Sequence, residues 1–118
     1  MPPRKKCSLK KMRATDTAWL AGWLEGEGCF NVASVNGSRM ARIAAGSTDR
    51  DILDYALTIT GVGNITLRKR GPTNVKPLWL WSVNAQDDVR ALMVRILPWM
   101  GERRTQKIRA IMAEKGWS

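Results

Sequence analysis

A glutamate near the start of the chain, Glu27, stands where a divalent metal ion could bind. It lies in the stretch Leu20-Ala21-Gly22-Trp23-Leu24-Glu25-Gly26-Glu27-Gly28. The four-residue spacing of Leu20 and Leu24 predicts a short helix that ends at this stretch. The last carbonyls of a helix have no intrahelical partner and its dipole is negative there, so a carboxylate at this end needs a cation beside it. An oxygen-seeking ion such as Mg²⁺ suits both groups, which predicts half of a metal site.

Two glycines, Gly22 and Gly26, share the same four-residue spacing on that helix. Each costs about 1 kcal/mol relative to alanine inside a helix, so a compensating reason is expected. A flat face that packs against another helix would supply it, although close packing within the chain's own core would do so as well. The helix is expected to begin near Thr15 or Asp16, since either side chain can cap a helix N-terminus.

The nonapeptide resembles the signature of the LAGLIDADG homing endonucleases. Glu25 and Glu27 stand where the signature has aspartates, and Gly26 replaces an alanine. The positions identical to the signature are Leu20, Ala21, Gly22 and Gly28. The resemblance implies that Glu27 ligates a divalent metal, Mg²⁺ or Mn²⁺, with the carbonyl of Gly26 as a helper.

A function also follows from this resemblance. It implies a site-specific endonuclease of the homing type, which hydrolyses phosphodiester bonds of double-stranded DNA and serves intron or intein mobility. The chain holds one copy of the signature, so a homodimer is expected, with Gly22 and Gly26 at the interface and two Glu27 carboxylates side by side. A symmetric dimer favours a roughly palindromic target.

Relatives also place a basic residue near the scissile phosphate. Arg103 is the first candidate for this catalytic role and Arg104 the second, at the start of the last predicted helix. A solvated basic helix start is the alternative for both arginines.

One departure from the family pattern concerns the chemistry. Relatives often carry a polar residue at the end of the second strand, where this chain has Ala45, and Ser47 is the nearest substitute. Two further readings stay open: a non-cleaving DNA-binding regulator, and an intron RNA maturase, which the resemblance permits because some relatives assist splicing.

The composition narrows the function classes independently of any motif. The 118 residues contain 20 Lys and Arg against 10 Asp and Glu, a formal net charge of +10, which points to a polyanion such as nucleic acid. Histidine is absent, which excludes Ser-His and Cys-His nucleophilic schemes and zinc sites that need imidazole. The two cysteines, Cys7 and Cys29, suggest no disulfide framework, so an intracellular, non-secreted setting is expected. No apolar run approaches the length of a membrane span.

Two segments are predicted along the chain. Residues 1–14 form a basic N-terminal arm that is expected to be mobile, either a phosphate-binding tail or a solubilising leader. Residues 15–118 form a single domain of the LAGLIDADG endonuclease type.

The domain is predicted to be α+β. Strands over 29–35 and 38–45 are joined by the hairpin turn Asn36-Gly37, and a second pair covers 64–70 and 78–83. Ser47 or Thr48 is expected to cap the helix between the hairpins, and Asn84, with Asp87, the helix after them. A final helix is expected over Glu102–Lys115, after Pro98. The order α-β-β-α-β-β-α-α favours a four-stranded antiparallel sheet with helices on one face.

The helix-free face of such a sheet is expected to lie in a groove of DNA. Size favours burying Trp79 and Trp81 on the opposite face. Arginine can pair with guanine and asparagine with adenine, or the same side chains can contact only phosphate and water. The residues expected to contact DNA are Asn31, Arg39, Arg42, Thr66, Arg68 and Arg70.

Overall fold

Four helices lie together on one face of an antiparallel sheet in the computed structural model, which describes residues 7–68 and 76–117. The sheet order is β1-β2-β4-β3. The elements are α1 (Ala14–Glu27), β1 (Gly28–Val35), β2 (Ser38–Ser47), α2 (Arg50–Thr60), β3 (Asn64–Arg68), β4 (Leu78–Val83), α3 (Gln86–Ile96), the short 3₁₀ helix η1 (Leu97–Trp99) and α4 (Glu102–Lys115). The predicted α+β class and element order are confirmed.

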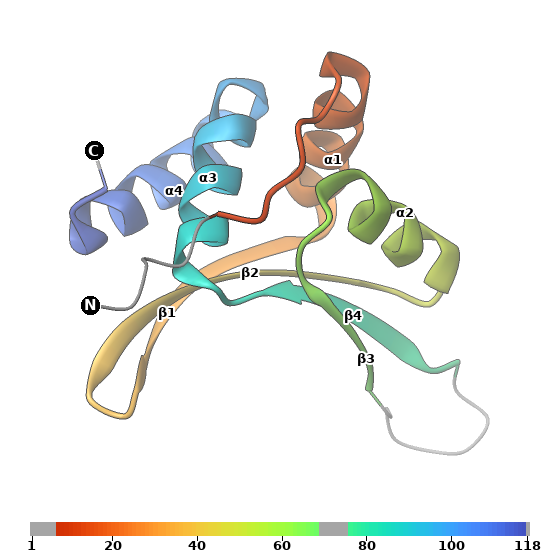
Figure 1. Cartoon of the computed structure of the whole chain (residues 1–118), viewed down its shortest axis with the longest axis horizontal. Helices are drawn as coiled ribbons and strands as arrows, with labels where there is room; N and C mark the ends of the chain where they lie inside the picture. Colours follow the sequence, from red (N-terminus) through yellow and green to blue (C-terminus); the bar gives the residue numbers. More distant parts are fainter. Residues whose placement is uncertain (1–6, 69–75, 118) are drawn as a thin grey trace.

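The two hairpins give the sheet its shape. Asn36 and Gly37 both have positive φ, 50° and 81°, which matches the predicted two-residue turn between β1 and β2. Strands β1 and β2 on one side and β3 and β4 on the other bend away from the helices, so the helix-free face of the sheet is concave (Figure 1). The β3–β4 connection falls on residues 69–75, which lie outside the described part of the chain, together with the expected strand end at Arg70.

The core lies between this sheet and the helices. Trp81 is fully buried, Val83 nearly so, and Trp79 packs against the same cluster, as size predicted. The Nε1–H group of Trp81 donates to the carbonyl of Val62, 3.0 Å away, so the indole is buried with its polar atom satisfied. The leucines that carried the helix prediction, Leu20 and Leu24, are completely buried.

Three predicted helix caps are wrong. Arg13 precedes α1 in the N-cap position, and Asp16 instead accepts hydrogen bonds from Arg13 Nε at 3.2 Å and Tyr55 Oη at 3.1 Å. Asp49 takes the N-cap position of α2, because strand β2 continues through Ser47. Ala85 takes the N-cap position of α3. The side-chain amide of Gln86 donates to the Ala41 carbonyl and accepts from the Ala41 N–H, both at 2.8 Å. At α1 and α3 a tertiary contact is made near the helix start, and at α2 strand β2 extends over Ser47, one of the two predicted caps.

The first described residues differ from the predicted mobile arm. Residues 8–13 run across the helices, where Met12 is 8% exposed and Leu9 packs against the core. The Ser8 N–H donates to Asp88 at 2.7 Å, and the Lys10 N–H donates to the Thr60 carbonyl at 2.8 Å. Apolar side chains at two positions of this segment anchor it despite its charge. Residues 1–6 lie outside the described part.

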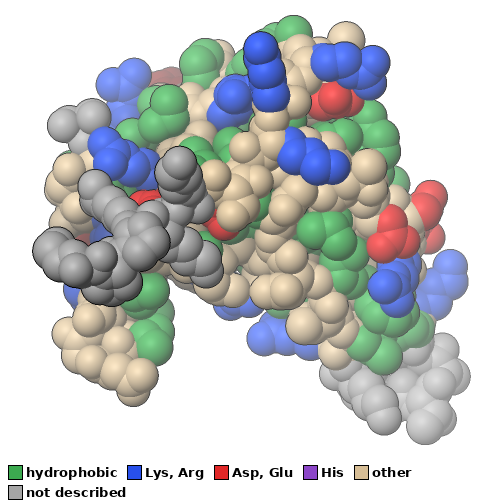
Figure 2. Space-filling view, viewed as in Figure 1, with side chains coloured by type: hydrophobic (Ala, Val, Ile, Leu, Met, Phe, Trp, Pro, Cys, Tyr) green, Lys and Arg blue, Asp and Glu red, His purple; other side chains and the backbone are tan. Residues whose placement is uncertain are grey.

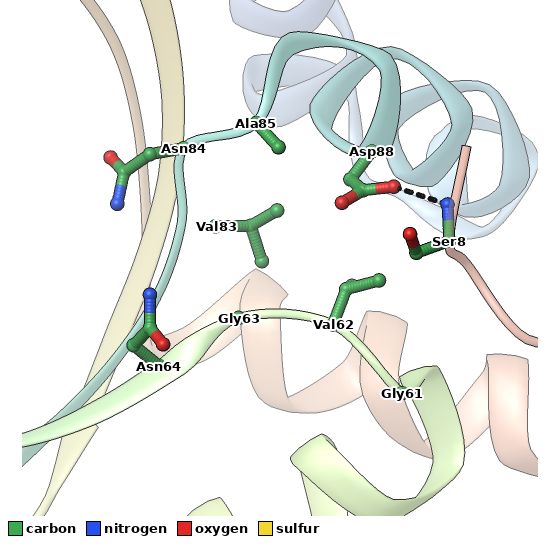
Figure 3. Close-up of a pocket in the computed structure, with 9 residues that line it drawn as sticks. All are labelled: Ser8, Gly61, Val62, Gly63, Asn64, Val83, Asn84, Ala85 and Asp88. Carbon is green, nitrogen blue, oxygen red and sulfur yellow. Dashed lines mark hydrogen bonds between the residues drawn. The ribbon is translucent and has the colours of Figure 1, made fainter. Parts of the chain in front are cut away.

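A small pocket lies where this segment meets the α2–β3 turn and the β4–α3 connection. Figure 3 shows Asp88 in its wall, hydrogen-bonded to the backbone of Ser8. The lining includes the glycines Gly61 and Gly63, whose positive φ angles of 70° and 99° make the tight turn possible. The pocket lies on the helix side of the molecule, so we assign it to the anchoring of the N-terminal segment.

Candidate nucleic-acid interface and metal centre

Helix α1 passes directly into the edge strand β1, and the two glutamates lie at this junction. Glu27 is the last helical residue and is exposed, whereas Gly28 is buried. The Gly28 N–H caps the helix by donating to the Leu24 carbonyl. A Cβ atom at Gly28 would collide with the same carbonyl, so only glycine allows this direct passage from helix to strand. The geometry holds the Glu27 carboxylate at the surface, beside the start of the sheet.

The guanidinium of Arg104 already contacts carbonyl groups at the end of α1. The Nη1 group of Arg104 lies 2.5 Å from the Gly28 carbonyl oxygen, and its Nε lies 3.3 Å from that of Glu25. The same Nε is 3.5 Å from a carboxylate oxygen of Glu25, and the guanidinium lies over the ring of Phe30, 5.9 Å from its centroid. Arg104 therefore binds the backbone on both sides of Glu27.

The other carboxylate oxygen of Glu25 accepts a hydrogen bond from the N–H of Gly101. Gly101 is the N-cap residue of α4, whose first N–H groups lack intrahelical partners. A Cβ at Gly101 would lie 2.6 Å from that carboxylate oxygen, so the glycine leaves room for this contact. Glu25 and Arg104 together join the end of α1 to the beginning of α4.

A basic groove separates the start of β1 from the first turns of α4. Residues 28–31 form one wall, and the other wall carries Arg103, Arg104 and Lys107. Arg103 and Lys107 are exposed and stand four residues apart on one helix face. Sequence reasoning missed Lys107, although this spacing from Arg103 was the signal that could have found it.

The predicted glycine face of α1 is open in this single chain. Gly22 and Gly26 are exposed, and a Cβ added to either would meet no atom within 4 Å among the described residues. Neither glycine has a positive φ. No contact among the described residues therefore explains why glycine, which has a low helix propensity, stands at these two positions.

The concave face of the sheet carries the other expected DNA contacts. Asn31 and Arg42 are directly opposite each other in the β1–β2 register, and Thr66 and Arg68 share this face on β3. The sequences of all four strands contain none of the chain's 10 acids. In Figure 2, which views the sheet from its side, blue Lys and Arg side chains are more widespread than red Asp and Glu side chains. The face can therefore approach a polyanion without carboxylate repulsion.

Arg39 differs from the expectation. It pairs with Ser34 in the sheet register, and strand alternation turns both toward the helices, opposite to Arg42. Its Nε lies 3.1 Å from a carboxylate oxygen of Glu114 on α4, and its Nη1 donates to the Ser34 hydroxyl. Arg39 is therefore not on the concave face, and that it contacts DNA stays a prediction. Arg70 lies outside the described residues.

The end of β2 also bears on the chemistry. Ala45 is 2% exposed and pairs with Gly28 across the β1–β2 ladder. The Ser47 hydroxyl accepts a hydrogen bond from the Asp49 N–H at 3.0 Å. Ser47 shares the helix-facing side of the strand with Ala45, so its hydroxyl is directed away from the concave face.

The donor set at the end of α1 fits a hard divalent ion. Within residues 7–68 and 76–117, no group of three or more Cys, Asp and Glu side chains is close enough to hold a metal. One chain thus offers the exposed Glu27 carboxylate and helix-end carbonyls such as that of Gly26. Mg²⁺ is commonly bound by one or two carboxylates with water and substrate phosphates, and these oxygen donors match that preference.

No helix in the described part of the chain is both long and apolar enough to cross a membrane.

Comparison with solved structures identifies the fold. The homing endonuclease I-CvuI, in complex with the I-CreI target, superposes with a TM-score of 0.65 and 20% identity over 84% of this chain and 64% of that one. The LAGLIDADG homing endonuclease I-GzeII, in complex with its DNA target, gives 0.67 and 16% over 97% of this chain and 42% of that one. The group I intron-encoded homing endonuclease I-CeuI, complexed with DNA, gives 0.59 and 15% over 88% and 55%.

These likenesses confirm the resemblance that the nonapeptide suggested: the fold is that of the LAGLIDADG homing endonucleases. No protein-family model and no curated protein matches the sequence. The chain spans between two fifths and two thirds of the length of the three relatives above.

Proposed function

We propose that this chain is a LAGLIDADG homing endonuclease that cleaves double-stranded DNA as a homodimer. The single observation that carries the proposal is the exposed Glu27 carboxylate at the end of a glycine-bearing helix, beside a concave sheet face without acids. The solved structures of the same fold are homing endonucleases in complex with DNA. An activity on genomic or phage DNA would be exercised inside a cell.

The dimer supplies what one chain lacks. Packing of two α1 helices along Gly22 and Gly26 brings two Glu27 carboxylates together and doubles the concave surface. Like charges at close range raise the free energy of the metal-free pair, and a shared cation relieves that repulsion. The two-fold axis in turn favours a roughly palindromic target.

Each group of residues has a separate task in the reaction. Glu27 and the Gly26 carbonyl supply oxygen ligands to Mg²⁺ or Mn²⁺, which when bound neutralises developing phosphate charge and activates water. Arg103, exposed in the groove beside Gly28, stabilises charge on the phosphate. Asn31, Arg42, Thr66 and Arg68 hold the duplex against the sheet.

The buried Ala45 supports a second candidate, a DNA-binding regulator of the same fold that does not cleave. With an apolar residue there and the Ser47 hydroxyl bonded to the backbone, the described residues at the end of β2 offer no obvious group to orient the attacking water. Binding and cleavage therefore have to be measured separately.

The test starts with selection of bound duplexes from a DNA library, followed by incubation of the selected sequences with Mg²⁺. The expected result is specific double-strand cuts by the wild type and none by Glu27→Gln, with DNA binding retained. Asp51→Asn is the matched control, because Asp51 is an exposed carboxylate on α2, and it should cut as the wild type does. Equal cutting by Glu27→Gln would remove Glu27 from the mechanism. Tight, specific binding with no cutting by the wild type would support the regulator.

A further inference from the structure

The contacts of Arg104 lie on both sides of Glu27, the residue whose carboxylate is proposed to bind metal. Its Nε binds the carbonyl of Glu25, two residues before Glu27, and its Nη1 binds the carbonyl of Gly28, one residue after it. One planar guanidinium thus fixes the backbone on both sides of Glu27.

The environment of Arg104 differs from that of a side chain that meets a phosphate. Only 16% of the side chain is exposed, and the guanidinium lies over the Phe30 ring. A contact with phosphate through Nε or Nη1 would replace hydrogen bonds to two carbonyls and the ion pair with Glu25. Its neighbour Arg103 is exposed in the same groove and can meet a phosphate without breaking any of these bonds.

Glu25 contacts both Arg104 and the start of α4. One of its carboxylate oxygens is 3.5 Å from Arg104 Nε, and the other accepts the N–H of Gly101 at the start of α4. The acid therefore fixes Arg104 and the first turn of α4 relative to the end of α1. Glu25 and Glu27 are two residues apart in the signature but have different surroundings: Glu25 is half-buried and bonded, whereas Glu27 is exposed.

We propose that Arg104 is a positioning residue, which holds the Glu25–Gly28 backbone so that Glu27 faces its metal ion, and that Glu25 is the acid that keeps Arg104 in place. This inference rests on the proposed function, since it gives the arginine a role toward the Glu27 metal site. It also separates two arginines that the sequence left as alternatives. Arg103 contacts DNA, and Arg104 acts through Glu27.

The chemistry of the side chain makes the proposal testable with a conservative variant. Lysine keeps the charge but has a single ammonium group, which cannot reproduce the fork that reaches both carbonyls. A positioning role is therefore lost in Arg104→Lys, whereas a role as a general source of positive charge is largely retained. Removal of such supporting contacts around metal ligands commonly lowers metal affinity by about 10- to 100-fold.

The experiment compares the full-length wild type with Arg104→Lys and Arg103→Lys. Mn²⁺ binding is measured by electron paramagnetic resonance in the presence of a selected DNA duplex, and amide hydrogen exchange is measured without metal. Arg104→Lys should weaken Mn²⁺ binding by about 10-fold or more and speed exchange of the amides of residues 26–29. Arg103→Lys should leave the amide exchange of residues 26–29 at the wild-type rate while weakening DNA binding.

Two further variants distinguish positioning from a loss of folding. In a Glu27→Gln background, Arg104→Lys should cause no additional loss of Mn²⁺ affinity, because a residue that acts through Glu27 has nothing left to position. Glu25→Gln retains an oxygen for Gly101 but lacks the ion pair with Arg104, so it should show a smaller loss than Arg104→Lys. Circular dichroism at the assay temperature establishes that each variant is folded.

The failures of the two proposals can be told apart. If the wild type binds Mn²⁺ and Arg104→Lys binds it equally well but binds DNA more weakly, Arg104 is a phosphate contact and the inference is overturned. If the wild type itself binds no Mn²⁺, the proposed function fails and the role toward metal fails with it. Unchanged amide exchange in Arg104→Lys would overturn the inference that Arg104 holds the Glu25–Gly28 backbone.

Discussion

Substitution of the glycines on α1 should have opposite effects on the single chain and on its dimer. Gly22 lies in the interior of α1 and Gly26 in its last turn, and a Cβ at either meets no atom within 4 Å among the described residues. Alanine at these positions should therefore stabilise the isolated chain by up to about 1 kcal/mol each, through helix propensity alone. If the glycines instead form a close contact between two α1 helices, the same methyl groups weaken the dimer.

The size of the second effect follows from packing. Extra atoms forced into a close-packed contact typically cost about 1–3 kcal/mol. Since about 1.4 kcal/mol corresponds to tenfold in a dissociation constant, Gly26→Leu should raise the dimer Kd by roughly 5- to 150-fold. Gly26→Ala should raise it less, because it adds a single methyl group to each subunit.

Sedimentation equilibrium gives the dimer Kd, and urea denaturation at protein concentrations below that Kd gives the stability of the single chain. A matched control is Ala110→Leu, at an exposed position on α4 away from the glycine face. The reasoning is refuted if Gly26→Leu leaves the dimer Kd at the wild-type value, or if Gly26→Ala destabilises the single chain.

Two further predictions concern the arginines of the sheet and an acid on α1. Arg42→Ala should weaken DNA binding by about 1–3 kcal/mol. Arg39→Ala should change DNA binding little, because Arg39 is bonded to Glu114 on the helix side of the sheet. Fluorescence anisotropy at fixed salt measures both affinities, and equal losses would contradict the assignment of the two arginines to opposite faces. The hydrogen bond from Arg13 holds the pKa of Asp16 below its usual value of 3.8, so its stabilising contribution is present above about pH 4 and is lost as the pH falls through the lowered pKa. The difference in unfolding free energy between the wild type and Asp16→Asn, from urea denaturation, should therefore be present at pH 7 and vanish in strong acid, and a difference that grows on acidification would contradict this.

Local signals in the sequence predicted most elements. The turn Asn36-Gly37 needs two residues that tolerate positive φ, and the chain adopts it there. The last helix runs over Glu102–Lys115, the predicted range, because Pro98 prevents the preceding helix from continuing and Gly101 begins the next. The burial of Trp81 followed from the amount of apolar surface that it removes from water.

Predictions failed where a side chain has a partner that is distant along the chain. Asp16 bonds to Tyr55 from α2 rather than capping its own helix, and Leu9 and Met12 bind the supposedly mobile N-terminal segment to the core. The local sequence pattern is the same whether or not such a distant partner exists. What decides the outcome is a partner that comes near only after the chain has folded.

Some features of the candidate site likewise follow from local sequence, and others depend on distant contacts. The sequence by itself determined the helix that ends at Glu27, the alternation that puts Asn31 and Arg42 on one face, and the absence of acids from the strands, since all three depend on residue type and short-range periodicity. Only the tertiary structure separated Arg103 from Arg104, because their difference lies in carbonyls more than 70 residues away that the α1–β1 junction brings to α4. The same holds for Arg39, whose partner Glu114 is 75 positions along the chain. Periodicity fixes which way a side chain points, and the packing of distant elements decides what it meets there.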